Sequence, residues 1–344
     1  MSSILVTGGT GYIGSHTTVE LLEAGMDVVI VDNLENSSRE VIDGITAITG
    51  TRPGFEETDL RDKASVLTLF EKYPDIGAVI HFAAYKAVGE SVEKPLAYYE
   101  NNLLSLINLL EAMQKHEVRN IVFSSSCTVY GQPEIIPVSE EAPVQAATSP
   151  YGNTKQISEE ILRDVVASKT GLRVVSLRYF NPIGAHPSAM IGELPLGVPA
   201  NLVPFITQTV MGLHDTLQVF GDNYNTPDGS AIRDYINVVD LARAHVVAIR
   251  RLLEQKQLAS FEVFNLGTGR GLSVFEVIRA FEKATGETVI YRVVERREGD
   301  TEQVFADTRL ANEELGWKAE TGIEETLKSA WKWEKKIRSN TSGA

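Results

Sequence analysis

The sequence predicts an α/β fold, a doubly wound parallel sheet with a smaller C-terminal domain that binds a ligand. Three observations lead to this prediction. Short runs rich in β-branched residues alternate with amphipathic stretches through the first half of the chain, a glycine-rich turn follows the first run, and the alternation loosens after residue 181. Strands that alternate with helices form parallel sheets covered on both faces, and such sheets bind ligands at the carboxyl ends of their strands.

The elements of the first half follow from residue periodicity. Short β-branched runs favour strands, whereas apolar residues that recur every three or four positions form one face of a helix. Six segments are therefore expected to be strands: 3–9, 27–33, 54–60, 78–84, 120–126 and 173–180. Four segments between them are expected to be helices: 12–25, 62–73, 97–116 and 152–170.

The second half is less regular. The segment 181–205 is rich in Pro and Gly, and its scattered apolar residues favour a binding excursion over a linker. The run 261–269 predicts a strand that rejoins the sheet, and a helix is expected at 273–285, where Ser273 can cap the first turn. A closing helix is expected at 323–337.

Composition sets the number of domains and the class of partner. With 344 residues and 43% hydrophobic composition, the chain can bury a large core and divide into two domains. We expect the sheet domain over 1–180, rejoined by the strand near 261–269, and a mainly substrate-binding domain over 181–344. The formal charge of -14 argues against nucleic acid or an anionic membrane as partner, so an anionic substrate would need a local basic pocket.

The single cysteine, Cys127, excludes an internal disulfide framework and suits a reducing compartment. The N-terminal residues lack a basic start followed by an apolar stretch, and the chain contains no apolar run of 18 residues. We therefore expect a cytoplasmic protein without a membrane span. The six histidines have no metal-ligand spacing, so we expect His81 to be a packed residue. Packing roles are also expected for three tryptophans, Trp317, Trp331 and Trp333.

The segment VTGGTGYIG indicates a dinucleotide site. Gly9, Gly11 and Gly14 have the spacing G-x-G-x-x-G directly after the first strand, where glycines allow a tight turn and a close approach to a pyrophosphate. Asp32 ends the second expected strand, 18 residues past Gly14. A carboxylate there accepts hydrogen bonds from both ribose hydroxyls and repels a 2′-phosphate, and Asn33 follows it instead of Arg. NAD is therefore expected rather than NADP, in a Rossmann-type domain.

Tyr151 and Lys155 are four residues apart, so on a helix both side chains lie on one face. A tyrosine is a poor base at neutral pH, but a nearby ammonium and the positive ring of an oxidised nicotinamide both favour phenolate. Lowering its pKa by about 3 units requires roughly 4 kcal/mol. Tyr151 is thus a candidate general base, and Ser126, in the hydroxyl row SSSCT at a strand end, can hydrogen-bond the same substrate oxygen.

Nine motifs follow one another in the order found in the extended short-chain dehydrogenase/reductases. They resemble most closely the UDP-galactose 4-epimerase group of that family. The resemblance covers about residues 3 to 335, and the motifs are VTGGTGYIGSH, DNLENS, HFAAYKAVGESVEKP, SSSCTVYG, SPYGNTK, RYFNPIGAHPS, RDYINVVDLARAH, NLGTG and RREGD.

The resemblance implies an activity and a set of site residues. Hydride would leave C4 of a UDP-hexose for NAD and return to the other face of the 4-keto sugar, interconverting UDP-glucose and UDP-galactose. Tyr151 would be the base, Lys155 would hold the nicotinamide ribose, and Ser126 would assist at O4. Further cofactor positions would be Gly8, Gly11, Tyr12, Ile13, Gly14, Asp32, Asn33, Asn36, Ser37, Asp59, Leu60, Phe82, Ala83, Lys86, Asn101 and Phe180. Positions for the nucleotide diphosphate would be Asn181, Asn201, Leu202, Phe220, Arg233, Arg297 and Asp300.

Two further expectations come from the resemblance. The segment 96–116 and the helix after Tyr151 would pair with their copies in a homodimer. Val304 would border the C2 side of the sugar, where a large aromatic excludes N-acetyl groups and a small residue admits them. Valine is intermediate in size, which implies some activity on UDP-N-acetylhexosamines.

Other activities of the same fold stay open at this point. A 4,6-dehydratase carries Asp-Glu and a decarboxylase a Glu where this chain has Cys127 and Thr128. A thiol nucleophile at Cys127 is disfavoured because the sequence places no His or Asp to activate it. A dehydrogenase that releases NADH and a non-catalytic NAD-binding protein are two further alternatives.

Overall fold

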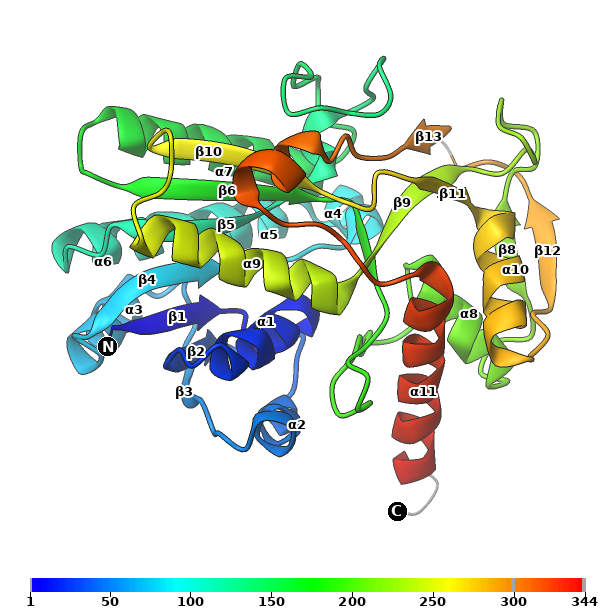
Figure 1. Cartoon of the computed structure of the whole chain (residues 1–344), viewed down its shortest axis with the longest axis horizontal. Coiled ribbons are helices and arrows are strands. Elements are labelled where there is room, and N and C mark those ends of the chain that lie inside the picture. Colours follow the sequence, from blue (N-terminus) through cyan, green and yellow to red (C-terminus); the bar gives the residue numbers. More distant parts are fainter. Residues whose placement is uncertain (1, 298–300, 342–344) are drawn as a thin grey trace.

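The computed structural model describes residues 2–297 and 301–341 (Figure 1). Seven parallel strands form its central sheet in the order β10-β6-β5-β4-β1-β2-β3. Their bounds are β1 Ser3–Thr7, β2 Val28–Asp32, β3 Gly54–Glu57, β4 Ile76–His81, β5 Asn120–Ser126, β6 Arg173–Tyr179 and β10 Phe261–Leu266. The α/β fold class with a parallel sheet is confirmed.

Helices cover both faces of this sheet. The strands are almost continuously apolar, so apolar side chains project from both faces and both must be buried. One face packs against α1 Tyr12–Glu23, α2 Glu40–Thr49 and α9 Val238–Leu253. The other packs against α3 Lys63–Lys72, α6 Ser105–Lys115 and α7 Pro150–Ala167. In Figure 1, α1 and α9 lie side by side across one face of the sheet.

A second region extends from the carboxyl edge of the sheet. A four-stranded sheet there contains β7 Asn181–Ile183, β9 Ile232–Asn237, β11 Gly271–Ser273 and β13 Gln303–Val304. A separate pair joins β8 Leu217–Phe220 to β12 Tyr291–Val294. The core of this region lies among β8, β9 and three helices, α8 Leu202–Val210, α10 Val274–Thr285 and α11 Ile323–Thr341.

The chain passes between the two regions more than once. It leaves the sheet after β6, builds β7, α8, β8 and β9, and returns through α9 and β10 before ending in α10 and α11. The strand expected at 261–269 is β10, which pairs with β6. Within the segment 181–344, therefore, α9 and β10 belong to the core of the parallel sheet. The two-domain division at residue 180 stays a prediction.

The expected helix at 97–116 is wrong in detail. The structure has α5 Pro95–Tyr99, a π-helical turn at Glu100–Leu104 and then α6. Pro95 begins the first piece because its missing N–H is not needed at that position. Several other elements were not predicted, among them α2, α4 Val88–Glu93 and α9. The Pro- and Gly-rich segment 181–205 includes β7 and the start of α8.

No helix in the described part of the chain is long and apolar enough to cross a membrane.

The expected cap of α10 is present and gives a stability prediction. Ser273 Oγ accepts from Glu276 N at 3.0 Å, and Glu276 Oε2 accepts from Ser273 N at 2.8 Å, so two helix-terminal donors are satisfied reciprocally. Ser273→Ala should lower the free energy of unfolding by about 1 kcal/mol in urea denaturation. Ser260→Ala, at an exposed serine, is the control. Equal stability of the two variants would contradict the capping role.

Candidate active site

The carboxyl ends of the parallel strands gather the predicted residues at one edge of the sheet. The glycine turn follows β1, and Asp32 ends β2. Phe82 and Ala83 follow β4, Ser126 ends β5, and Phe180 follows β6. Because β1, β2, β4, β5 and β6 run in parallel, these positions share one edge.

The glycine turn forms a close backbone cradle before α1. Gly8 has φ of 68° and its N–H donates to Val31 O at 2.8 Å, which ties the turn to β2. A Cβ on Gly14 would lie 2.3 Å from Gly8 O, so only glycine allows this approach of helix to strand. Gly11 is the N-cap of α1 and has no side chain to occupy the helix terminus. Backbone N–H groups at this terminus fit a phosphate group.

Asp32 is held by hydrogen bonds at the end of β2. Its Oδ2 accepts from Thr10 N at 3.2 Å, and its Oδ1 accepts from Leu34 N at 3.0 Å and from Ser37 Oγ at 3.0 Å. A further 2.8 Å contact joins the hydroxyls of Thr10 and Ser37. The carboxylate is therefore fixed beside the glycine turn, at the place where a dinucleotide fingerprint requires its ribose acceptor. Ile13 lies in the first turn of α1 and Asn36 in the loop after β2.

The other predicted cofactor positions surround this cradle. Asp59 pairs with Arg61, and the Arg61 hydrogen bond holds the pKa of the Asp59 carboxyl below its usual value. Asn33 accepts from Glu35 N and also hydrogen-bonds Asp59. Leu60 O accepts from Asn108 Nδ2 at 2.9 Å, which fixes the loop after β3.

Near α1, Lys86 Nζ lies 5.6 Å from the centre of the Tyr12 ring, and Asn101 lies buried in the π-helical turn. Single π-helical turns occur often at functional positions.

The hydroxyl row at the end of β5 divides between the two faces of the sheet, as neighbouring strand residues must. Ser124 Oγ accepts from the Tyr179 hydroxyl, and Ser125 Oγ donates to Glu159 Oε1 at 2.7 Å. Ser126 Oγ accepts from Thr128 N at 3.2 Å and hydrogen-bonds the Tyr151 side chain. Of the three serines, Ser126 alone meets Tyr151 among the interactions of the described residues.

The helix α7 brings Tyr151 and Lys155 to this strand end. Ser149 caps the helix by accepting from Gly152 N at 3.1 Å, and Pro150 occupies its first position. Lys155 is buried and its Nζ donates to Ser124 O at 2.6 Å. Tyr151, Lys155 and Ser126 are therefore held on one side of the strand end, as the spacing of four residues indicates.

Burial has the largest effect on the pKa of Tyr151. Burial raises the pKa of Tyr151 to about 12, against a smaller lowering by Ser126. Burial also lowers the pKa of Lys155 to about 8, while Glu159 raises it. The expected lowering combines the ammonium of Lys155 with the positive ring of an oxidised nicotinamide, and it stays a prediction. Phenolate at neutral pH therefore requires positive charge supplied with the ligand.

The predicted substrate residues lie in the second region. Arg297 lies over the Phe220 ring, 3.8 Å from its centre, so two of them meet directly. Arg233 is in β9, and its charge lowers the pKa of Cys127, which burial raises to about 11. Asn181 is in β7 beside β9, and Asn201 is the N-cap of α8, which begins at Leu202. The predicted residue Asp300 lies outside the described residues.

Val304 lies on the short strand β13, opposite Arg233 of β9. Its side chain packs on the apolar cluster that contains Phe180. Cys127, the neighbour of Ser126 in the sequence, packs on the same cluster. Asp234 fixes this arrangement, since its carboxylate accepts from Thr268 N at 2.8 Å and from Ala306 N at 3.2 Å.

Sequence reasoning missed two polar residues that join these parts. Glu193 Oε1 accepts from Lys86 Nζ at 3.1 Å and from Asn201 Nδ2 at 2.8 Å, linking a predicted cofactor residue to a predicted substrate residue. Asn102 accepts from Tyr85 N at 2.8 Å and donates to Thr154 Oγ1 at 3.0 Å, which ties the loop after β4 to α7. Neither has a motif of its own, although Asn102 adjoins Asn101 in the sequence.

His81 and the three tryptophans, for which packing roles are expected, are held by contacts within the protein. His81 Nδ1 lies 2.8 Å from Thr7 Oγ1, and burial lowers the pKa of His81 to about 3. Trp317 and Trp331 are buried, and Trp333 Nε1 donates to Glu193 O at 2.8 Å. Within residues 2–297 and 301–341, no cluster of His, Cys, Asp and Glu could hold a metal ion.

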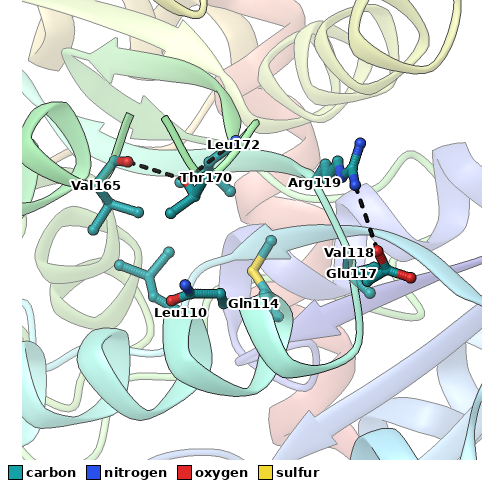
Figure 2. A pocket seen from close by; sticks show the side chains of 9 residues that line it. Leu110, Gln114, Glu117, Val118, Arg119, Val165, Thr170 and Leu172 are labelled. Carbon is teal, nitrogen blue, oxygen red and sulfur yellow. Dashed lines mark hydrogen bonds and ion pairs between the residues drawn. The ribbon is translucent and has the colours of Figure 1, made fainter. Parts of the chain in front are cut away.

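A separate hollow lies at the opposite edge of the sheet (Figure 2). The segments before β5 and β6 line it together with the ends of α6 and α7, and Glu117 pairs with Arg119 at 3.5 Å. Because it adjoins the amino ends of β5 and β6, it lies away from Ser126 and Tyr151. The candidate active site is therefore the carboxyl edge.

Comparison with known proteins places this geometry in a family. Residues 5–330 match the family model described as GDP-mannose 4,6 dehydratase. The chain is 49% identical to the UDP-glucose 4-epimerase of Mus musculus, an alignment that covers 100% of this chain and 99% of the relative.

Two solved structures are similar over nearly all of both chains. The UDP-glucose 4-epimerase of Stenotrophomonas maltophila, with bound NAD and formylated UDP-arabinopyranose, has a TM-score of 0.95 and 48% identity and covers 99% of this chain and 100% of its own. The enzyme of Bifidobacterium longum, in complex with NAD+ and UDP, has a TM-score of 0.93 and 47% identity, covering 98% and 99%.

The glycine cradle gives a test of the nucleotide site. Gly14→Ala should lower the content of bound dinucleotide at least tenfold, because the added Cβ meets Gly8 O and pushes α1 away from β1. Gly89→Ala is the matched control, since its Cβ would meet no atom within 4 Å. Nucleotide is measured by absorbance and chromatography after denaturation. Equal content in both variants would remove the cradle from the site.

Proposed function

Because the chain belongs to the UDP-glucose 4-epimerase family, we propose that it interconverts UDP-glucose and UDP-galactose by inverting C4 of the sugar with bound NAD. The observation that carries this proposal is the cluster of Tyr151, Lys155 and Ser126 beside the glycine cradle. Full-length identity near 50% to UDP-glucose 4-epimerases supports it. The enzyme is thus an isomerase of the extended short-chain dehydrogenase/reductase family.

The residues of the cluster divide the proton chemistry. Tyr151 takes the proton from the C4 hydroxyl and returns it after inversion, and Ser126 holds the same oxygen through its hydroxyl. Lys155, fixed on Ser124 O, contributes positive charge next to that exchange. When bound, NAD accepts a hydride from C4 and gives it back. Inversion requires the sugar to turn within the pocket, which Val304 and Cys127 border in this proposal.

The cofactor is proposed to be NAD because of the environment of Asp32. Its carboxylate, oriented by Thr10 and Ser37, would accept hydrogen bonds from the ribose hydroxyls and repel a 2′-phosphate. The glycine cradle would hold the pyrophosphate. Recovery of NADP in place of NAD from the purified protein would overturn this assignment.

The nucleotide diphosphate is proposed to bind Arg233 and Arg297. Guanidinium groups pair with phosphate oxygens in two parallel hydrogen bonds, which compensates for the acidic net charge of the chain. The Arg297 guanidinium lies over the Phe220 ring, which would support its orientation in this proposal. The other proposed contacts are Asn181 in β7, and Asn201 and Leu202 at the start of α8.

Dehydration is not favoured, although the matching family model carries a dehydratase description. Eliminating water from a keto sugar needs an additional acid and base beside it. This chain places Cys127 and Thr128 after Ser126, and burial raises the pKa of the Cys127 thiol to about 11. A neutral thiol and a hydroxyl cannot fill those two roles at neutral pH.

We also propose a cytoplasmic location, which the single free cysteine supports, since a reducing compartment keeps thiols unpaired.

Tyr151→Phe tests the proposed base. The wild-type protein should interconvert UDP-glucose and UDP-galactose with no added cofactor and no net NADH. The variant should lose about 10² to 10⁴-fold in turnover and keep its NAD, because it deletes a proton acceptor and little volume. Tyr291→Phe, at an exposed tyrosine of β12, is the control. Near-normal turnover in Tyr151→Phe would exclude this base, and net NADH would indicate a dehydrogenase.

Val304→Tyr tests the size of the sugar pocket. The wild-type enzyme should act mainly on the plain hexoses and less on UDP-N-acetylglucosamine. Tyrosine should penalise the acetylated substrate by about 1–3 kcal/mol through overpacking and leave UDP-glucose largely unaffected. The ratio of kcat/KM for the two substrates measures this effect in both proteins. An unchanged ratio would place Val304 away from the sugar.

A homodimer is proposed from exposed apolar residues on α4 to α6. Val88 and Val92 lie on one face of α4, and Leu104 and Ile107 follow on the next segments, 37% and 40% exposed. Apolar residues at a two-fold axis contact their own copies or close neighbours.

The wild-type protein should therefore sediment at micromolar concentration with about twice the 37.7 kDa chain mass. The double variant Leu104→Glu/Ile107→Glu should sediment as a monomer. A dimer of this variant would have to bury glutamates of both copies close together at the two-fold axis. Leu258→Glu, at an exposed leucine after α9, should leave the dimer intact. A monomeric wild-type protein would reject the proposal.

A further inference from the structure

Glu159 and Arg178 form a buried ion pair beneath α7. Their exposed fractions are 1% and 2%. Arg178 Nε donates to Glu159 Oε1 at 2.9 Å and Arg178 Nη2 to Glu159 Oε2 at 2.5 Å, so the contact is bidentate. A pair at this depth is retained only when its remaining hydrogen-bonding groups are also satisfied.

The same carboxylate satisfies three more groups. Ser125 Oγ donates to it at 2.7 Å, Ser176 Oγ at 3.0 Å and Arg163 Nη2 at 3.1 Å. Ser125 and Arg178 are opposite each other in the ladder of β5 and β6, so their side chains share the sheet face under α7. Glu159 thereby joins α7 to both strands.

This contact lies directly behind the proposed catalytic cluster. Glu159 follows Lys155 by one helical turn and Tyr151 by two. Ser125, bound by Glu159, stands between Ser124, whose carbonyl accepts from Lys155, and Ser126. Lys155 Nζ lies 5.0 Å from the centre of the Phe123 ring on the same strand.

We propose that Glu159 is a positioning residue for epimerisation: it fixes α7 to the strand end that carries Ser126 and places a buried negative charge one turn behind Lys155. The proposal rests on the function proposed above for Tyr151 and Lys155. It assigns to Glu159 a role that acts through Lys155, without contact with the substrate.

The charges around Lys155 support this role. Burial lowers the pKa of Lys155 to about 8, and Glu159 opposes that shift. His81 contributes no charge at neutral pH, since burial and Lys155 lower its pKa to about 3. Two further titratable groups face Glu159: Arg163 on α7 and Arg178 on β6. Three face Tyr151: Cys127 of η2 (Cys127–Tyr130), Tyr179 on β6 and Tyr98 on α5. Without the Glu159 charge, Lys155 would lose its proton at lower pH.

The main experiment is the pH dependence of kcat in Glu159→Gln, which removes the charge and keeps the side-chain size. The basic limb of the kcat–pH profile should move to lower pH by about one unit. At pH 8 kcat should be roughly fivefold lower, with little change in the Kd for UDP. Glu159→Asp keeps the charge, so the basic limb of its kcat–pH profile should stay at the wild-type pH.

Glu262→Gln is the matched control. It breaks the ion pair with Arg251, whose Nε and Nη2 donate to Glu262 at 2.7 and 2.9 Å, at the start of β10. This variant should have a lower free energy of unfolding, but the basic limb of its kcat–pH profile should stay at the wild-type pH. A role of Glu159 in stability alone would make the two Gln variants behave alike.

A second readout does not depend on activity. The folded-state pKa of Lys155, about 8, lies below its unfolded value of about 10.4. Folded Lys155 thus releases its proton before the unfolded chain does, so this group adds stability as pH rises above 8 and loses that contribution as pH falls through 8. In Glu159→Gln the rise should begin at lower pH. The difference in free energy of unfolding between the wild-type protein and Glu159→Gln, which we call the stability gap, should then shrink between roughly pH 6 and 8.

The outcomes separate this inference from the proposed function. The role of Glu159 would be overturned if folded Glu159→Gln showed both an unshifted basic limb of the kcat–pH profile and a constant stability gap. It would also be overturned if the basic limb moved equally far in Glu262→Gln. A wild-type enzyme without epimerase activity would overturn the proposed function, while the stability gap would still test the charge. If Glu159→Gln does not fold, Glu159→Gln/Arg178→Gln leaves neither member of this ion pair unpaired. It should show a shift in the same direction but smaller, because the positive charge of Arg178 is removed as well.

Discussion

The parallel order of the seven strands is the constraint on which the candidate site depends. A parallel ladder ends its strands at one edge, so residues more than a hundred positions apart in the sequence become neighbours. Gly8 follows β1, Asp32 ends β2 and Ser126 ends β5, so all three lie at that edge. The helix α7 then needs only the correct rotation to add Tyr151 and Lys155. That rotation is determined by polar contacts inside the fold.

Those contacts make an unusual face for a buried sheet. Beneath α7, β5 and β6 present Ser125, Ser176 and Arg178 where apolar residues would pack well. One carboxylate, Glu159, accepts from all three, so burial leaves none of them without a partner. A polar contact of this kind specifies one arrangement of helix on strand, whereas apolar residues tolerate small slides. The proposed catalytic geometry benefits from that specificity.

The second region adjoins the candidate site because the chain leaves the sheet after β6 and later returns to it. After β6 the chain builds β7 to β9, and α9 then brings it back to pack beside α1. Asp234 joins β9 to the turn after β10 and to Ala306, just after β13. Ala306 belongs to the apolar cluster with Phe180 on which both Val304 and Cys127 pack. Glu193 makes a similar connection between Lys86 and Asn201. Both carboxylates link segments that the sequence separates widely.

Residue patterns in the sequence predict the α/β class, most strands of the sheet, the glycine cradle with Asp32, and the common face of Tyr151 and Lys155. These features rest on local rules: residue periodicity, steric freedom of glycine, and the helical repeat. The folded structure was needed to show the environment of Tyr151, the contacts of Glu159, Glu193 and Asp234, and the return of α9 to the sheet. Burial and long-range pairing depend on which segments meet in space, and short-range sequence patterns carry little information about that.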